Sequence, residues 1–344
     1  MNPRLKSRLG VNPRLKSRLG CLSLKRLLPT TSRYVTDQPS RGFTPRLSPL
    51  SPLSPLSRLA RLSRLSRLFS PLPPLALTAL ALACIAGAGW AQDTIPEPTV
   101  EIVFLDVGHG DAILIRSPEG EVALVDAGLA PIGDRLRALG VERVEVVIAT
   151  HPSPNHIGGM ADVFRSFPVR FYVDNGMTDT TAAYRELIRA IQQRFPRYLE
   201  PEDRSMRLGS VRLDVLAPPD SASTIGNRSV GLVVRFGEFR AFFAGDAELE
   251  EVEYFLAEKD VPEVQLLKAP NHGSRAAVSP ASLTALKPQV VVIPVGPNDQ
   301  GLPHRWALSY YESATRHNVY RTDLQGSVTV LGRRDGSFQV RSKE

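Results

Sequence analysis

The chain has 344 residues and a formal net charge of +7, with 42 Lys and Arg against 35 Asp and Glu. The charge is divided unevenly: the first 91 residues carry 15 Lys and Arg and one acid, Asp37, and the remainder carries 27 Lys and Arg against 34 acids. The body of the protein is therefore acidic. An acidic body argues against broad electrostatic binding of nucleic acid, which needs a basic surface.

The N-terminal segment is basic and of low complexity. A nine-residue stretch occurs twice, at 2–10 and 12–20, and tracts of Ser, Pro, Leu and Arg continue to Pro74. Such a sequence cannot bury enough apolar surface to fold alone. We predict that residues 1–74 are a disordered leader, or an overextended start of the gene.

An apolar run follows at 75–89, preceded by Arg67 and followed by small residues. This pattern is typical of a signal peptide cleaved after Ala88 or Ala91. An uncleaved N-terminal anchor is the alternative, although the run is short for a spanning helix of about 20 residues. Lipidation at Cys84 is a third interpretation. We expect the protein to be exported, as an extracellular, periplasmic or membrane-anchored protein.

The folded domain is predicted from residue 99 to 344. Its first half contains strands at 100–107, 111–115, 122–126 and 144–150, with helices at 135–139 and 184–195. The second half contains strands at 211–216, 230–236, 240–244, 264–268, 290–295, 327–331 and 338–341, with helices at 248–258, 280–286 and 306–314. Apolar alternation and flanking turn residues define these elements. The order predicts an α/β protein in which two mixed sheets pack face to face, with helices outside.

Histidines and acids follow several of these strands. The strand at 144–150 runs directly into His151 and His156, although two histidines alone could be a loop with solvated rings. Asp246, His272 and His304 follow three further apolar strands. Imidazole and carboxylate groups gathered at strand ends point to a site for zinc, manganese or iron. Both cysteines, Cys21 and Cys84, precede the body, so no thiolate is expected among the ligands.

Six short motifs together resemble one family. They are FLDVGHGDAILI (104–115), VDAG (125–128), THPSPNHIGG (150–159), GD (245–246), NHGS (271–274) and PH (303–304). Their order is similar to that in the metallo-β-lactamase-fold domain of bacterial competence DNA-uptake proteins of the ComEC type, over roughly 100–333. The resemblance implies a metallo-β-lactamase αββα sandwich. We expect a stand-alone exported relative, because no channel-forming membrane domain accompanies the motifs.

The resemblance also implies a ligand set. His151, His156, Asp246 and His272 match the family's metal ligands, with Asp246 and His272 also placed among the catalytic residues, and His304 would complete the set. Ser153 and Asn155 stand where carboxylates are expected, and Asn271 and Leu302 stand where histidines are common. Neutral oxygens bind cations more weakly than carboxylates do. We therefore expect one Zn²⁺ or Mn²⁺ ion rather than two, or none.

Several residues are placed near the site. The resemblance puts Asp106, Asp111 and Asp126 on its rim and Asn227 and Ser229 beside it, and His109 stands where the family usually has Gln. Local turn hydrogen bonds explain Asp106 and Asn227 equally well. His317 is expected to be a solvated surface residue.

Two functions remain open at this stage. The first is a metal-dependent hydrolase, phosphodiesterase or nuclease-like, acting on a small-molecule or nucleic-acid phosphodiester through a metal-activated water. A lactamase or another ester hydrolase belongs to the same class. The second is a binding module that kept the fold and lost catalysis, which Ser153, Asn155 and Asn271 favour. The sequence fixes neither the substrate nor the oligomeric state.

Overall fold

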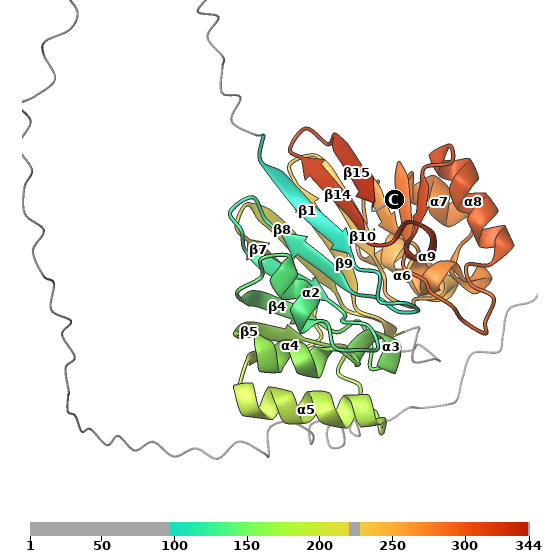
Figure 1. Cartoon of the computed structure of the whole chain (residues 1–344). Coiled ribbons are helices and arrows are strands. Elements are labelled where there is room, and N and C mark those ends of the chain that lie inside the picture. The colour runs from blue at the N-terminus through green and yellow to red at the C-terminus, as the bar shows by residue number, and fades with distance from the viewer. Residues whose placement is uncertain (1–96, 220–227, 343–344) are drawn as a thin grey trace, which may run out of the picture. The chain divides into compact units, whose positions relative to one another are not determined.

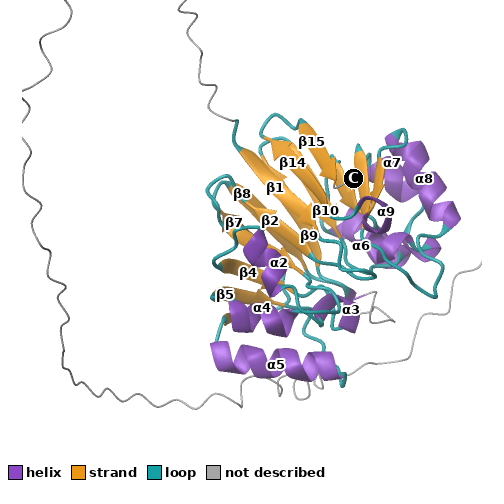
Figure 2. Ribbon diagram, in the orientation of Figure 1, coloured by secondary structure: helices purple, strands orange, loops and turns teal. Residues whose placement is uncertain are grey.

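A computed structural model of the protein describes residues 97–219 and 228–342. In this part of the chain two β-sheets pack face to face, with helices on both outer surfaces (Figures 1 and 2). The predicted leader, the apolar run at 75–89 and Asn227 lie outside the described residues. Within the described residues, no helix has the length and hydropathy needed to cross a membrane.

The first sheet has eight strands in the order β15-β14-β1-β2-β3-β4-β5-β6. Pairing is antiparallel from β15 to β3 and parallel from β3 to β6. The strands are β1 (Thr99–Phe104), β2 (Ile113–Arg116), β3 (Val122–Val125), β4 (Val144–Ile148), β5 (Val169–Val173), β6 (Arg197–Leu199), β14 (Val328–Arg333) and β15 (Phe338–Ser342).

The second sheet has seven strands in the order β13-β12-β11-β10-β9-β8-β7. It repeats the same change, from antiparallel pairing between β7 and β10 to parallel pairing between β10 and β13. The strands are β7 (Arg204–Leu208), β8 (Val211–Leu216), β9 (Gly231–Phe236), β10 (Phe239–Phe243), β11 (Leu266–Lys268), β12 (Val290–Ile293) and β13 (Val319–Arg321).

Three apolar layers hold the domain together. Alternate residues of both sheets, such as Phe104 and Phe243, fill the space between them. A second layer joins the first sheet to helices that include α2 (Gly133–Ala138), α4 (Met160–Ser166) and α5 (Ala182–Arg194). A third joins the second sheet to α6 (Leu249–Glu258), α7 (Pro280–Leu286) and α8 (Arg305–Thr315). The helices α3 (Pro154–Ile157) and α9 (Thr322–Gln325) are single turns.

The predicted architecture is confirmed, with additions. The sixteen predicted strands and helices of the body are present within a few residues, and the predicted bounds of β8 and α7 match. Strands β5, β6, β7 and β13 and helices α3, α4 and α9 escaped prediction because they are short or mix charged with apolar residues. The last two strands, β14 and β15, return to the first sheet, where β14 pairs with β1.

This topology brings three strand ends together. In each sheet the carboxyl ends of the parallel strands lie on one edge, and ligands bind in open α/β sheets at such edges. The loops that follow β4, β10 and β11 carry the conspicuous histidines and Asp246. The fold therefore gathers residues that are as much as 121 positions apart in sequence, from His151 to His272.

Candidate metal centre

Three buried imidazoles surround one carboxylate at this edge. His151, His156 and His272 are all 1% exposed or less, and the side chain of Asp246 is 15% exposed. His156 Nε2 lies 3.2 Å from Asp246 Oδ2, and His151 Nε2 lies 3.6 Å from the same oxygen. His272 Nε2 lies 3.3 Å from the other oxygen, Oδ1. We call these four residues the ligand group.

Each imidazole is held from behind through its other nitrogen. His156 Nδ1 is 2.7 Å from Asp126 Oδ2, and His272 Nδ1 is 2.7 Å from the carbonyl oxygen of Pro294. His151 Nδ1 is 3.1 Å from Thr150 Oγ1. These partners can each accept a hydrogen bond from an Nδ1 proton. In the neutral form of each ring, a proton on Nδ1 leaves a lone pair on Nε2. Holding one ring nitrogen so that the other faces inward is the usual arrangement around metal-binding histidines.

The inward-facing atoms fit a cation. Among the described residues, His156 Nε2 and Asp246 Oδ1 are buried and have no hydrogen-bond partner. A lone pair and a carboxylate oxygen 3.2 Å apart repel each other unless a proton or a metal ion lies between them. Three imidazole nitrogens and a carboxylate form a donor set that suits Zn²⁺ and Mn²⁺. The ligand group is therefore a buried His/Asp cluster whose chemistry fits a metal ion.

The electrostatics of the site differ between the three rings. Burial, together with neighbouring His156, lowers the pKa of His151 to about 3. Burial likewise lowers the pKa of His272 to about 4, against the attraction of Asp246 and Asp111. Both rings are thus neutral at pH 7. Burial opposes a charge on His156 as well, but the carboxylates of Asp246 and Asp126 raise its pKa well above the ordinary value.

A second layer of polar residues lies beneath the ligand group. We call it the floor: Asp111, Asp126, Thr150 and Lys268, none of them more than 2% exposed. Asp126 accepts from the Thr150 backbone at 2.8 Å and from its hydroxyl at 2.7 Å. Lys268 Nζ lies 2.6 Å from Asp111 Oδ2 and donates to the carbonyl oxygen of Gly245 at 2.7 Å. The floor thus holds two carboxylates and an internal ammonium group.

Lys268 is the functional residue that sequence reasoning missed. It is the last residue of β11, a strand with all three residues buried. A charged residue at the end of an otherwise apolar strand was the available signal, because Lys is almost never fully buried unless it is paired.

The backbone is strained where it presents these groups. Asp126, Asn271 and His272 have φ values of 57°, 44° and 51°, a region that non-glycine residues rarely adopt. Such conformations persist only where the surrounding structure enforces them, and they cluster at functional sites. Here the left-handed turn between β11 and α7 turns the His272 ring toward Asp246.

The other residues of the predicted ligand set have different surroundings. Asn155 Nδ2 lies 3.4 Å from His272 Nε2, so this amide borders the ligand group. Ser153 precedes α3 and is half-buried. His304 precedes α8, and its Nδ1 accepts a hydrogen bond from the backbone of Trp306. Among the described residues, the triads whose ligand atoms lie within 4.8 Å of one another include neither His272, whose Nε2 is 3.3 Å from Asp246, nor His304. Its role as a ligand stays a prediction.

Residues predicted near the site have varied places. The His109 ring lies 4.5 Å, centroid to centroid, from that of His272, and burial lowers the pKa of His109. Asp106 accepts from the backbone of Gly108, which is the local turn bond considered from the sequence. Asn271 is half-buried in the left-handed turn. His317 is exposed, as expected.

Ser229 supports the site from the second sheet. Its hydroxyl accepts from the Asp246 backbone at 3.1 Å and lies 3.5 Å from His151 Nδ1. The Ser229 backbone donates to Glu251 on α6 at 3.3 Å. Glu251 is fully buried, and burial raises its pKa to about 9.

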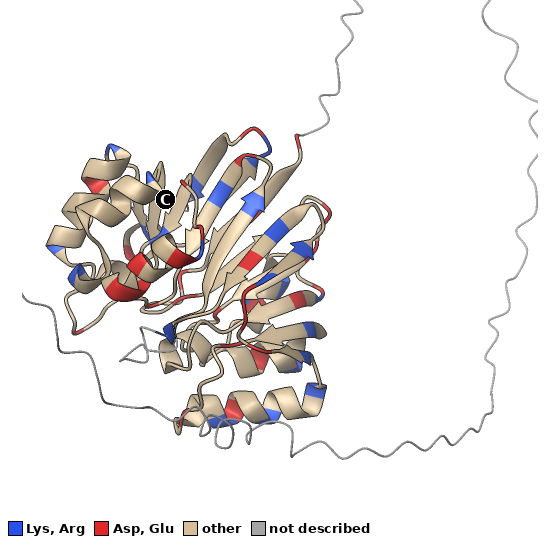
Figure 3. Ribbon diagram, turned by 180° about the vertical axis from the view of Figure 1, so that it is seen from behind, with Lys and Arg blue, Asp and Glu red and all other residues tan. Residues whose placement is uncertain are grey.

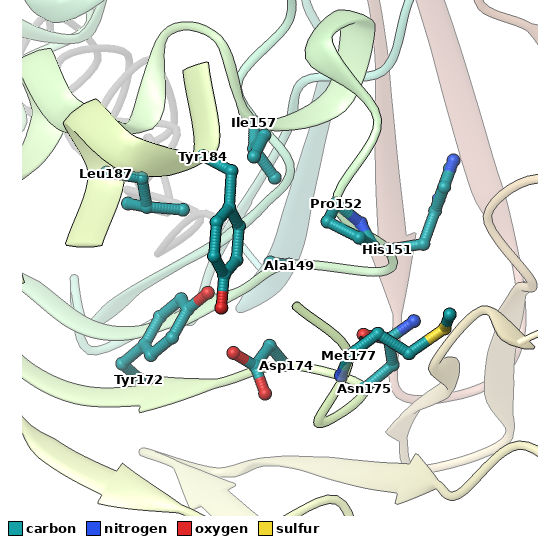
Figure 4. Close-up of a pocket in the computed structure, with 10 residues that line it drawn as sticks. All are labelled: Ala149, His151, Pro152, Ile157, Tyr172, Asp174, Asn175, Met177, Tyr184 and Leu187. Atoms are coloured by element: carbon teal, nitrogen blue, oxygen red, sulfur yellow. Dashed lines mark hydrogen bonds between the residues drawn. The ribbon is translucent and has the colours of Figure 1, made fainter. Parts of the chain in front are cut away.

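A small pocket lined by apolar and polar side chains adjoins His151 on the side of α5 (Figure 4). The hydroxyl groups of Tyr172 and Tyr184 point toward the carboxylate of Asp174, while the His151 ring points away from the pocket. Asp174 accepts hydrogen bonds from the Tyr198 hydroxyl and from the backbone of Gly176, both at 2.9 Å. These bonds give the buried Asp174 carboxylate its hydrogen-bond partners, so we assign these residues a structural role beside His151.

Two known proteins match about 70% of this chain in sequence. The chain is 24% identical over 269 residues to ComE operon protein 3 of Bacillus subtilis, covering 70% of this chain and 34% of that protein. It is 22% identical over 256 residues to Recombination protein 2 of Haemophilus influenzae, covering 72% of this chain and 30% of that protein. The matched region therefore spans about a third of the length of these relatives.

A solved structure and a family profile complete the comparison. The metallo-beta-lactamase fold protein YhfI of Bacillus subtilis is 10% identical, with a TM-score of 0.47, and the match covers 70% of this chain and all of that one. The profile of the Metallo-beta-lactamase superfamily matches residues 105–296, which include His151, His156, Asp246 and His272. The chain belongs to the metallo-beta-lactamase superfamily and has distant homology to proteins of the ComEC type.

Proposed function

We propose that this protein is an exported metal-dependent hydrolase that acts on phosphodiesters. The observation that carries the proposal is that the Nε2 atoms of three imidazole rings converge on the Asp246 carboxylate. Each ring is held in place through its Nδ1 atom. His151, His156, His272 and Asp246 would hold one Zn²⁺ or Mn²⁺ ion. Such an ion supplies Lewis-acid polarisation of a phosphoryl oxygen and a lowered pKa for a bound water.

The chain's own residues set the geometry for this chemistry. Asp126 and the Pro294 carbonyl orient His156 and His272, and Ser229 holds the backbone of Asp246. The site is rigid because its ligands follow strand ends and pack within a buried cluster. The Asp246 side chain, 15% exposed, is the most exposed member of the ligand group, so a substrate would approach the site beside it.

A small phosphodiester fits the surface better than a long polyanion does. Basic and acidic residues are interspersed over most of the ribbon, while α6 carries four Glu and no Lys or Arg (Figure 3). Residues 92–344 carry more acids than bases, so a nucleic acid would need local contacts near the site. We therefore propose a small-molecule phosphodiester, or the end of a nucleic acid, as the substrate class.

Activity toward a generic phosphodiester tests the proposal. The purified full chain should hydrolyse bis-p-nitrophenyl phosphate with added Mn²⁺ or Zn²⁺ and lose the activity with a chelator. His151→Ala and Asp246→Ala should each abolish turnover and leave the circular dichroism spectrum unchanged. His317→Ala removes an exposed histidine and should keep full activity. Full turnover by either site variant would exclude the ligand group from the mechanism.

A metal-binding module without catalysis is the second candidate. The observation that favours it is the absence of charge at two positions next to the ligand group, Ser153 and Asn155. The Asn155 amide stands 3.4 Å from His272 Nε2, where a carboxylate would bind a cation more strongly. Stoichiometric metal binding by the wild-type chain without turnover on phosphodiester, phosphomonoester or lactam substrates would favour this function over hydrolysis.

Export is a separate part of the proposal. The basic flank and the apolar run at 75–89 support cleavage after Ala88 or Ala91. The exported protein should begin between residues 89 and 93, as read by N-terminal sequencing after expression in a secreting host. Intact residues 1–74 on folded, exported protein would overturn the cleavage proposal.

A further inference from the structure

Two groups of metal-type ligands share His156. In the described residues, His151, His156 and Asp246 form one triad, and Asp111, Asp126 and His156 form another, with ligand atoms within 4.8 Å of one another in each. The first triad belongs to the ligand group and includes the partly exposed Asp246. The second is wholly buried and belongs, apart from His156, to the floor.

The floor already contains a cation. The Lys268 ammonium lies 2.6 Å from Asp111 Oδ2 and 4.0 Å from Asp246 Oδ1, and its side chain is fully buried. It also donates to the carbonyl of Gly245, the residue before Asp246. Burying an ammonium group is costly unless it is paired, and here the Asp111 carboxylate balances its charge and the Gly245 carbonyl accepts one hydrogen bond. Lys268 is thus a fixed charge between the floor and the ligand group.

Charge balance limits what else the site can bind. Its three buried carboxylates, Asp111, Asp126 and Asp246, carry three negative charges when ionised. One ammonium and one divalent ion balance them when the imidazoles are neutral. A second divalent ion would leave two positive charges in excess in a buried site, where like charges repel strongly.

We infer that Lys268 is a permanent internal cation that takes the place of a second metal ion and restrains the affinity of the site for the first. This inference rests on the proposed metal centre and deepens it. Because the ammonium repels a divalent ion bound beside Asp246, removing its charge should tighten metal binding. A lysine that only supported the fold would have the opposite effect, since its loss would loosen the site.

Mn²⁺ binding to the full chain separates these alternatives. Equilibrium dialysis should find one Mn²⁺ ion per wild-type chain. Lys268→Met should bind Mn²⁺ at least tenfold more tightly than the wild type, and Asp111→Asn at least tenfold more weakly. The double variant Asp111→Asn with Lys268→Met removes both charges of the pair and should return to within about threefold of the wild type. Lys287→Met, at an exposed lysine, should change nothing.

Each result has a definite consequence. Two ions per wild-type chain, or unchanged or weaker binding by folded Lys268→Met, would overturn the inference. If Lys268→Met does not fold, the double variant decides, because an affinity far from the wild type would contradict a balanced charge pair. A wild-type chain that binds no Mn²⁺ would instead overturn the proposed metal centre. Hydrolysis with one bound ion but no tightening in Lys268→Met would leave the proposed function standing.

Discussion

The floor and the ligand group are neighbouring layers of the site, but their carboxylates have different partners. In the floor, Asp126 is matched by Thr150 and His156, and Asp111 by Lys268. In the ligand group, the Nε2 atoms of three rings face the Asp246 carboxylate, and His156 Nε2 has no hydrogen-bond partner among the described residues. The floor thus pairs its carboxylates with protein groups, although neither oxygen of Asp111 has a hydrogen bond among the described residues, and the ligand group fits a cation.

Neutralising one carboxylate in each layer should give the largest difference in stability between the floor and the ligand group. Asp126→Asn keeps the shape and tolerates the φ of 57°, but it leaves His156 and Thr150 with a neutral partner. We expect a loss of about 4 kcal/mol in the free energy of unfolding, typical of breaking a buried charge pair. Urea denaturation with a chelator measures it.

Asp246→Asn is the matched change in the ligand group. Without metal it should cost less than half as much, because the Asp246 backbone contact to Ser229 survives and His156 keeps Asp126. Asp134→Asn, at a 99% exposed side chain, should have no measurable effect. Equal destabilisation by Asp126→Asn and Asp246→Asn would contradict the division between a structural floor and an open ligand group.

Adding carboxylates beside the ligand group should make the stability of the protein depend more strongly on metal. In the double variant Ser153→Asp with Asn155→Asp, new charges stand beside Asp246 and repel it, so the metal-free protein should melt at a lower temperature. With Mn²⁺ or Zn²⁺ the variant should gain more than the wild type. The gain is about 2.7 kcal/mol at a metal concentration one hundred times the Kd.

Melting temperatures with chelator and then with metal measure both effects of the double variant. Ser313→Asp, on the exposed face of α8, controls for the added charge. A metal-dependent shift no larger than that of the wild type would mean that positions 153 and 155 do not face the ion.

The sequence predicted the architecture and all four residues of the ligand group for a physical reason. Long strands such as β8 and β9 can be recognised from their apolar residues. The four residues of the ligand group lie in recognisable motifs that follow the ends of strands: His151, His156, Asp246 and His272. Lys268 could not be placed in the same way. Its role depends on Asp111, 157 positions earlier in the chain, and no local pattern reports a contact at that separation.

His304 is a residue for which the sequence pattern suggested a ligand but the structure shows a helix cap. Its position after an apolar strand is the same signal that marked His272, but the structure uses its Nδ1 to accept a bond from the α8 backbone. A polar residue before a helix is a common cap. Sequence alone does not distinguish a cap from a ligand, since both place a polar side chain at the end of an element.

The last prediction concerns Glu251, which supports Ser229 behind the ligand group. Burial raises the pKa of Glu251 to about 9, so the folded protein keeps a proton that the unfolded chain releases above about pH 4.5. The native state then binds more protons, and the stability contributed by this group is full below pH 4.5 and falls as pH rises to about 9. Glu251→Gln keeps an acceptor for Ser229 and has no proton to lose. The variant should match the wild type at pH 5 and exceed it by about 2 kcal/mol at pH 8.5, a rise of roughly 4 to 8 °C in melting temperature. Glu253→Gln, exposed on the same helix, should show no such trend. A Glu251→Gln advantage that is the same at pH 5 and pH 8.5 would show that Glu251 is ionised in the folded protein.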